Sequence, residues 1–144
     1  MPCLSEINLS LYTYRCQITE IIDGDSVWGL LDRGFGDHSL RELRLNRIDA
    51  WEPKGIERPL GYIAKEFLEE YMPVGSSVII QSKGFDSFGR LICELWLERE
   101  ECWVNLGDLL VEKGHAVYRD YRALKRRSFK RLALTALATI LGEK

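Results

Sequence analysis

The chain has 144 residues, of which 46% are hydrophobic and 29% are charged, so it can bury the core of one domain and is too short for two. Its formal net charge of −2 excludes a protein that holds nucleic acid by bulk positive charge alone. It has four cysteines without a CxxC pair and only two histidines, a composition that argues against a zinc site. We therefore expect a single domain over residues 1–144.

The two ends of the chain show no targeting or membrane signal. The first ten residues have no basic start and no long apolar stretch, so we expect a cytoplasmic protein, or a secreted one if a leader has been removed. The longest apolar run, residues 132–141, is interrupted by Thr135 and Thr139 and is shorter than the roughly 20 residues that cross a bilayer. We expect no association with a membrane.

The first part of the chain predicts strands. Residues 14–19 and 43–48 have the apolar–polar alternation of half-buried strands, and a further strand is expected at residues 26–31. Turn signals separate them at residues 23–25 (Asp-Gly-Asp) and 34–37 (Gly-Phe-Gly-Asp). Short turns between successive strands indicate an antiparallel meander.

The second part predicts helices around two further strands. Apolar residues at helical spacing predict helices over residues 60–72, 104–113 and 121–141, and strands are expected at residues 78–80 and 91–97. This order favours an α+β fold, mainly β: a five-stranded OB-fold Greek-key barrel with about three α-helices. Its core would span about residues 12–118, followed by a basic amphipathic helix at about 119–141. An open five-stranded sheet with one exposed face is the alternative.

Acidic and arginine residues fall at the turns of this barrel. If the first three strands form a meander, Asp25 and Asp49 can face one point and offer the oxygen ligands that suit calcium or magnesium. Glu52 would then be close enough to orient or deprotonate a water molecule. Arg44 and Arg90 would bring to the same cleft guanidinium groups that match phosphate oxygens. Metal, base and arginines together predict phosphodiester hydrolysis.

Each of these features taken alone has a plainer explanation. An Asp-Gly-Asp sequence is more often an ordinary turn, residues 86–90 make a common hairpin turn, and Arg44 alone is a surface cation. Asp49 and Glu52 alone can cap the following segment. It is their order along the chain that favours a functional site.

That order resembles the staphylococcal-nuclease-like (thermonuclease) domain family over about residues 14–118. The motifs that carry the resemblance are Ile-Ile-Asp-Gly-Asp-Ser-Val (21–27), Leu-Arg-Leu-Asn-Arg-Ile-Asp-Ala-Trp-Glu (43–52), Asp-Ser-Phe-Gly-Arg (86–90) and the segment 104–114. The resemblance implies an OB-type barrel with three helices. It also implies a nuclease that cleaves DNA and RNA, prefers single-stranded or frayed substrate and leaves 3′-phosphate ends.

The resemblance further implies a role for each matching position. Ca²⁺ would be held by Asp25, Asp49 and the backbone carbonyl of Ala50, with Asp23 as a further carboxylate nearby. Three catalytic residues would complete the site: Glu52 as general base, and Arg44 and Arg90 as the groups that hold the scissile phosphate and stabilise its transition state.

The chain departs from the family pattern inside the second motif. The family usually has Asp-Thr-Pro-Glu where this sequence has Asp49-Ala50-Trp51-Glu52, and Pro53 follows the glutamate. Proline fixes φ and would aim the glutamate, so the replacement bears on the orientation of Glu52. Trp51 itself is expected either in the core or as a ligand platform.

Residues near the C-terminus are candidates for contact with substrate. Residues 119–131 carry seven basic residues and one acidic residue, which fits a face that tracks phosphates or a solvated helix face. Tyr118 and Tyr121 could stack on a base or pack within the fold. Two other functions remain open. One is a non-catalytic OB-fold module that binds single-stranded nucleic acid or protein, and the other is a phage or plasmid protein that assembles through its last helix.

Overall fold

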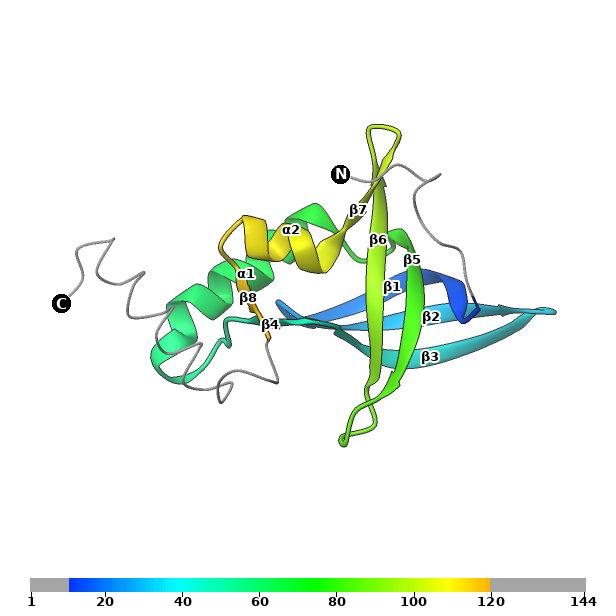
Figure 1. The fold of residues 1–144 in the computed structure, drawn as a ribbon, viewed down its shortest axis with the longest axis horizontal. Helices are drawn as coiled ribbons and strands as arrows, with labels where there is room; N and C mark the ends of the chain where they lie inside the picture. Colours follow the sequence, from blue (N-terminus) through cyan, green and yellow to red (C-terminus); the bar gives the residue numbers. More distant parts are fainter. Residues whose placement is uncertain (1–10, 120–144) are drawn as a thin grey trace.

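The computed structural model describes residues 11–119, and the expected last helix and Tyr121 lie outside this range. Its elements follow one another as β1 (Thr13–Asp23), β2 (Ser26–Gly34), β3 (Asp37–Leu45), β4 (Ile48–Ala50), the 3₁₀ turn η2 (Gly55–Glu57), α1 (Arg58–Tyr71), β5 (Ser77–Phe85), β6 (Leu91–Arg99), β7 (Cys102–Asn105), α2 (Leu106–Glu112) and β8 (Ala116–Tyr118). The two α-helices lie together beyond one end of the main sheet (Figure 1). Neither is long and apolar enough to cross a membrane.

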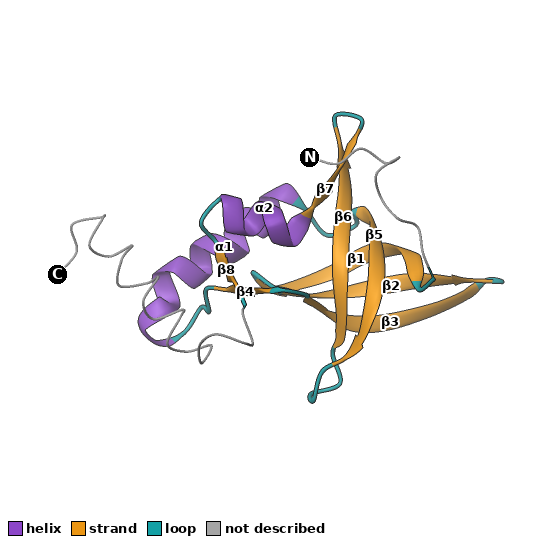
Figure 2. Ribbon diagram, in the orientation of Figure 1, coloured by secondary structure: helices purple, strands orange, loops and turns teal. Residues whose placement is uncertain are grey.

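The main sheet has six strands in the order β3-β2-β1-β5-β6-β7. Neighbouring strands are antiparallel, and in addition the last three residues of β3 pair in parallel with the start of β6. The β1–β2–β3 part therefore curls across the β5–β6 part, as Figure 2 shows. A mainly β, OB-like α+β fold is confirmed, but the expected number of five strands is wrong, because the main sheet has a sixth strand, β7.

The sixth strand, β7, follows a turn that the sequence does not signal. Glu100 and Glu101 both have positive φ angles, of 50° and 69°, which is the conformation of a tight hairpin turn. Glycine and asparagine usually occupy such positions, and two glutamates give no turn signal. The chain therefore makes a hairpin that the sequence did not predict. Cys102–Asn105 joins the sheet as a strand before α2 begins.

The third predicted strand is two strands. β3 ends at Leu45, the chain turns at Arg47 with φ 66°, and Ile48–Ala50 pairs with β8 in a separate two-stranded sheet. Alternation continues through the turn, so periodicity cannot reveal the break. The side chain of Arg47 holds the turn by binding Glu94 at 2.8 Å and Asp108 at 3.0 Å.

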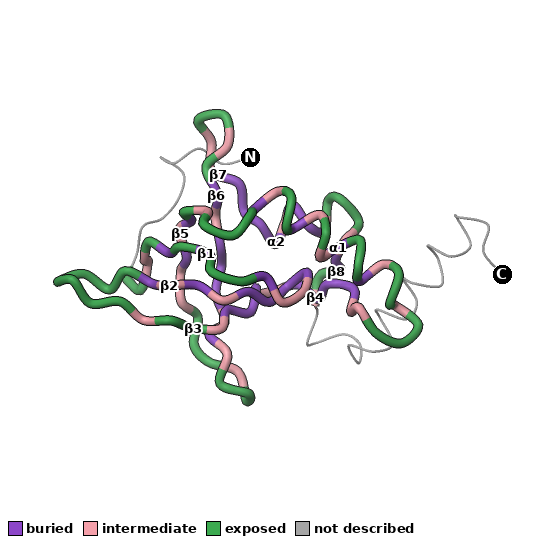
Figure 3. The backbone as a smooth tube through the Cα atoms, turned by 180° about the vertical axis from the view of Figure 1, so that it is seen from behind, coloured by how far each residue is buried: buried purple, intermediate pink, exposed green. Residues whose placement is uncertain are grey.

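A single apolar core fills the space between the sheet and the helices. Ile18, Leu43, Ile80 and Leu95, from four different strands, are completely buried, and Leu68 of α1 packs against them. Each such side chain contributes about 1.5–3 kcal/mol by leaving water. Burial is concentrated near the helices, whereas the far ends of the hairpins are exposed (Figure 3). Asp25, Arg44 and Asp49 are buried at the end of the sheet near the helices, whereas the β5–β6 turn before Arg90 is exposed, with Phe88 at its tip.

Candidate active site

The turn between β1 and β2 brings its aspartates against β4. The backbone N–H of Asp25 donates a hydrogen bond to Oδ1 of Asp23 at 3.1 Å, which fixes the turn. A Cβ atom on Gly24 would lie 2.9 Å from Cβ of Ala50 and 3.1 Å from Cβ of Ala64, so only glycine lets the turn approach β4 and α1 this closely.

Arg44 lies between the two aspartates that were predicted to converge. Its Nη2 atom is 3.3 Å from Oδ2 of Asp25 and 3.7 Å from Oδ1 of Asp49, and all three residues are buried. Its guanidinium also donates to the backbone carbonyls of Leu45 and Ile48, at 2.6 and 3.0 Å. The structure thus brings Asp25, Asp49 and Arg44 together, and Arg44 also fastens the end of β3 to the start of β4.

Asp25 has further hydrogen bonds from its surroundings. Its Oδ2 atom accepts from the backbone N–H of Ala50 at 3.0 Å, and its Oδ1 atom accepts from the hydroxyl of Ser26 at 3.2 Å. Its backbone carbonyl accepts from the N–H of Leu45 at 2.9 Å. The carboxylate therefore ties the first turn to the loop that carries Asp49 and Glu52.

Arg90 approaches the same cluster from the turn between β5 and β6. Nε of Arg90 donates to Asp86 at 2.7 Å, and Nη1 donates to the hydroxyl of Ser26 at 3.4 Å. Its side chain is 27% exposed, against 4% for Arg44, so Arg90 is the more accessible of the two arginines. Sequence analysis missed Ser26, which links Asp25 to Arg90. Its only sequence signal is its position directly after the Asp-Gly-Asp turn.

Burial disfavours the charged form of Asp23. It raises the pKa of Asp23 to about 7, and repulsion by the carboxylate of Asp25 adds to the rise, although Arg44 acts in the opposite direction. The carboxyl of Asp23 is therefore harder to ionise than that of an exposed aspartate.

The carboxylates of Asp25 and Asp49 are the side-chain donors that the sequence predicts for a calcium ion. Among residues 11–119 no group of three or more His, Cys, Asp or Glu side chains is placed to hold a metal. Oδ2 of Asp25 and Oδ1 of Asp49 lie 3.3 and 3.7 Å from the same atom, Nη2 of Arg44. The two carboxylate oxygens can therefore be no farther apart than these two distances added together. Carboxylate oxygens are ligands of the kind that calcium accepts, so the chemistry of Asp25 and Asp49 suits that ion.

The remaining substrate candidate in the described part of the chain, Tyr118, is tied to its neighbours. Its hydroxyl donates to Asp108 at 2.9 Å, which raises the pKa of Tyr118, and the guanidinium of Arg47 lies 5.9 Å from its ring. The ring is 45% exposed and lies in β8, directly across from Ile48 at the start of β4.

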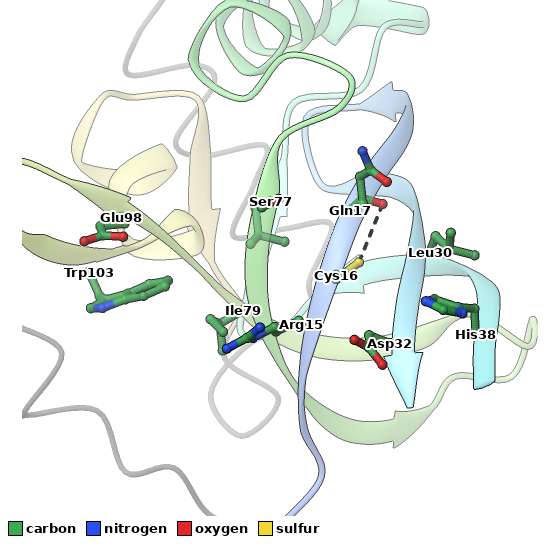
Figure 4. A pocket seen from close by; sticks show the side chains of 11 residues that line it. Arg15, Cys16, Gln17, Leu30, Asp32, His38, Ser77, Ile79, Glu98 and Trp103 are labelled. Atoms are coloured by element: carbon green, nitrogen blue, oxygen red, sulfur yellow. Dashed lines mark hydrogen bonds between the residues drawn. The ribbon is translucent and has the colours of Figure 1, made fainter. Parts of the chain in front are cut away.

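A surface hollow lies apart from this cluster. It has a volume of about 500 Å³ and is lined from β1, β2, β3, β5, β6 and β7, with Arg15, Asp32, His38 and Trp103 among its side chains (Figure 4). None of the predicted site residues lines it.

The fold and the cluster together define a class of protein: an OB-like domain that gathers two aspartates and two arginines at the end of its sheet. A family model described as staphylococcal nuclease homologue matches residues 42–138, about two thirds of the chain, and the chain belongs to this family. The matched range includes Arg44, Asp49, Glu52 and Arg90 and begins after Asp25. No curated protein matches the chain.

Proposed function

We propose that this protein is a calcium-dependent nuclease that hydrolyses phosphodiester bonds of DNA, RNA or both. The observation that supports the proposal best is the cluster itself. Asp25 and Asp49 flank one guanidinium, and Arg90 reaches the adjoining Ser26. Membership of a family whose members are generally nucleases also supports a nuclease function.

In this proposal the acidic residues hold the ion. Asp25, Asp49 and the backbone carbonyl of Ala50 would bind Ca²⁺, with Asp23 as a further carboxylate nearby. When bound, calcium would neutralise charge on the phosphodiester and polarise water.

The other residues act on the substrate. Glu52 accepts a proton from the attacking water, whose oxygen bonds to phosphorus. The bond from phosphorus to the 5′ oxygen breaks, that oxygen takes up a proton, and a 3′-phosphate remains. Arg44 and Arg90 stabilise the charge that develops on the phosphoryl oxygens, an effect worth roughly 3–4 kcal/mol per aimed donor.

The substrate we propose is a single-stranded or frayed nucleic acid. Asp25, Arg44 and Asp49 are buried, and a flexible strand can approach such residues more easily than a rigid duplex can. Tyr118 and Tyr121 are the proposed stacking residues, of which Tyr118 presents a half-exposed ring next to Arg47.

A nuclease assay with purified variants tests this function. Wild-type protein should cleave single-stranded DNA or RNA with calcium and lose that activity with EGTA. Arg90→Ala and Arg44→Ala should each reduce the rate by roughly 100-fold or more. Wild-type rates in both variants would refute the assignment.

A second candidate is a non-catalytic OB-fold module that binds single-stranded nucleic acid or protein. It is favoured by the position of Arg44, whose guanidinium is almost completely buried and bonded to two carbonyls. Binding of an oligonucleotide without calcium and without cleavage would select this alternative.

A further inference from the structure

The loop between β4 and α1 carries Glu52 and is anchored at its first residue, Trp51. This side chain is only 2% exposed, and its indole Nε1 donates a hydrogen bond to the carbonyl of Gly114 at 2.8 Å. Its backbone N–H donates to the carbonyl of His115 at 3.2 Å. Trp51 is therefore a core residue that anchors the loop to the turn after α2, and it is not a ligand platform.

The other end of the loop is held by Glu57. Glu57 is the N-cap residue of α1, yet its side chain makes no capping hydrogen bond to that helix. Instead its Oε1 atom accepts from the backbone N–H of Glu52 at 3.2 Å. An N-cap carboxylate usually accepts hydrogen bonds from backbone N–H groups of its own helix. The carboxylate of Glu57 instead binds the loop that precedes the helix.

The middle of the loop rests directly on α1. A Cβ atom on Gly61 would overlap the backbone carbonyl of Glu52 and the nitrogen of Pro53. Glycine in a helix interior costs about 1 kcal/mol relative to alanine, so its presence here serves this close approach. The backbone of Glu52 is thus fixed from three directions, by Trp51, Glu57 and Gly61.

We propose that Trp51 and Glu57 are positioning residues that set the direction of the Glu52 side chain. The inference rests on the proposed function, in which Glu52 is the general base. Glu57 holds the backbone N–H of Glu52 itself, so it acts on the reaction through Glu52. The backbone N–H of Trp51 belongs to the peptide group of the Ala50 carbonyl, so Trp51 orients that proposed calcium ligand as well as the start of the Glu52 loop.

The test compares Glu57→Ala with Glu57→Gln, because glutamine keeps an oxygen that can accept the Glu52 N–H. Glu57→Ala should lower kcat about 10- to 100-fold with little change in KM, since a misplaced catalytic group costs about that much. Glu57→Gln should restore most of the rate. Glu66→Ala, which removes an exposed carboxylate elsewhere on α1, is the matched control and should behave as wild type.

Two further readouts separate positioning from general stability. In a Glu52→Ala background, Glu57→Ala should cause no additional loss of rate, because its effect passes through Glu52. Amide hydrogen exchange followed by NMR should show faster exchange at Glu52 in Glu57→Ala than in wild type, with or without nuclease activity. Trp51→Phe, which keeps an aromatic side chain but is smaller and lacks the indole N–H, should show the same change in exchange.

Unchanged kcat in Glu57→Ala of an active enzyme would overturn the proposal, as would unchanged exchange at Glu52. An additional loss of rate in the Glu52→Ala background would also overturn it. If the wild type shows no calcium-dependent cleavage, the proposed function fails instead, and the exchange measurement still decides whether Glu57 holds the Glu52 amide.

Discussion

Replacing Arg44 by alanine should destabilise the fold by about 3–5 kcal/mol. The guanidinium donates to two buried carbonyls and lies within 4 Å of two buried carboxylates. Each hydrogen bond from a charged donor contributes about 1.5–3 kcal/mol, and removing one partner of a buried ion pair costs about 3–5 kcal/mol. Urea unfolding followed by circular dichroism at pH 7 with EGTA measures this loss in the free energy of unfolding.

Arg90→Ala is the matched control, because its ion pair with Asp86 is partly exposed and contributes less than about 1 kcal/mol. Calcium should then restore part of the stability of Arg44→Ala, since an ion between Asp25 and Asp49 supplies the missing positive charge. At 100 times its dissociation constant a ligand stabilises the folded state by about 2.7 kcal/mol. If Arg44→Ala unfolds at the same urea concentration as Arg90→Ala, with the same slope, the described role of Arg44 is wrong.

Three further predictions concern the turn, the ion and acid stability. Gly24→Ala should lower the free energy of unfolding by about 1–3 kcal/mol, because its Cβ would press against that of Ala50, and a thermal melt checks this. Asp49→Asn should weaken calcium binding by roughly tenfold or more in isothermal titration calorimetry, because ligand charge sets calcium affinity, and equal affinity in both proteins would contradict the proposed site. Burial alone would raise the pKa of Glu94, but hydrogen bonds from Arg47 and Asn105 outweigh it and lower that pKa. The stability from Glu94 is therefore present above about pH 4.5 and is lost as the pH falls through the lowered value. Glu94→Gln should be less stable than wild type at pH 7, and the difference should shrink between pH 5 and pH 3. A difference that is constant with pH would show that Glu94 is not held in its charged form.

The hairpins of this fold could be predicted because local residues specify them. The Asp-Gly-Asp turn and the turn at residues 34–37 each join antiparallel strands where the sequence placed them. The hairpin into β7 could not be predicted, because its two turn residues are glutamates in positive-φ conformations. The break between β3 and β4 depends on Arg47 binding Glu94, a contact between residues far apart in the sequence.

The residues of the candidate site could be predicted from the sequence, but the contacts that hold its Glu52 loop could not. The order of the motifs predicted that Asp25, Arg44 and Asp49 would meet, and they lie together, while their roles stay predictions. The way in which the Glu52 loop is held could not be foreseen, because it depends on Trp51 reaching Gly114 across the fold. Periodicity and turn signals describe neighbours along the chain, whereas these contacts arise only when separate elements pack.

A crystal structure of the protein soaked with calcium and a nucleotide tests the central claim most directly. The account predicts density for one ion between the carboxylates of Asp25 and Asp49, with a phosphate of the nucleotide against the guanidinium of Arg90. An ion bound elsewhere, or a phosphate that lies away from both arginines, would contradict it.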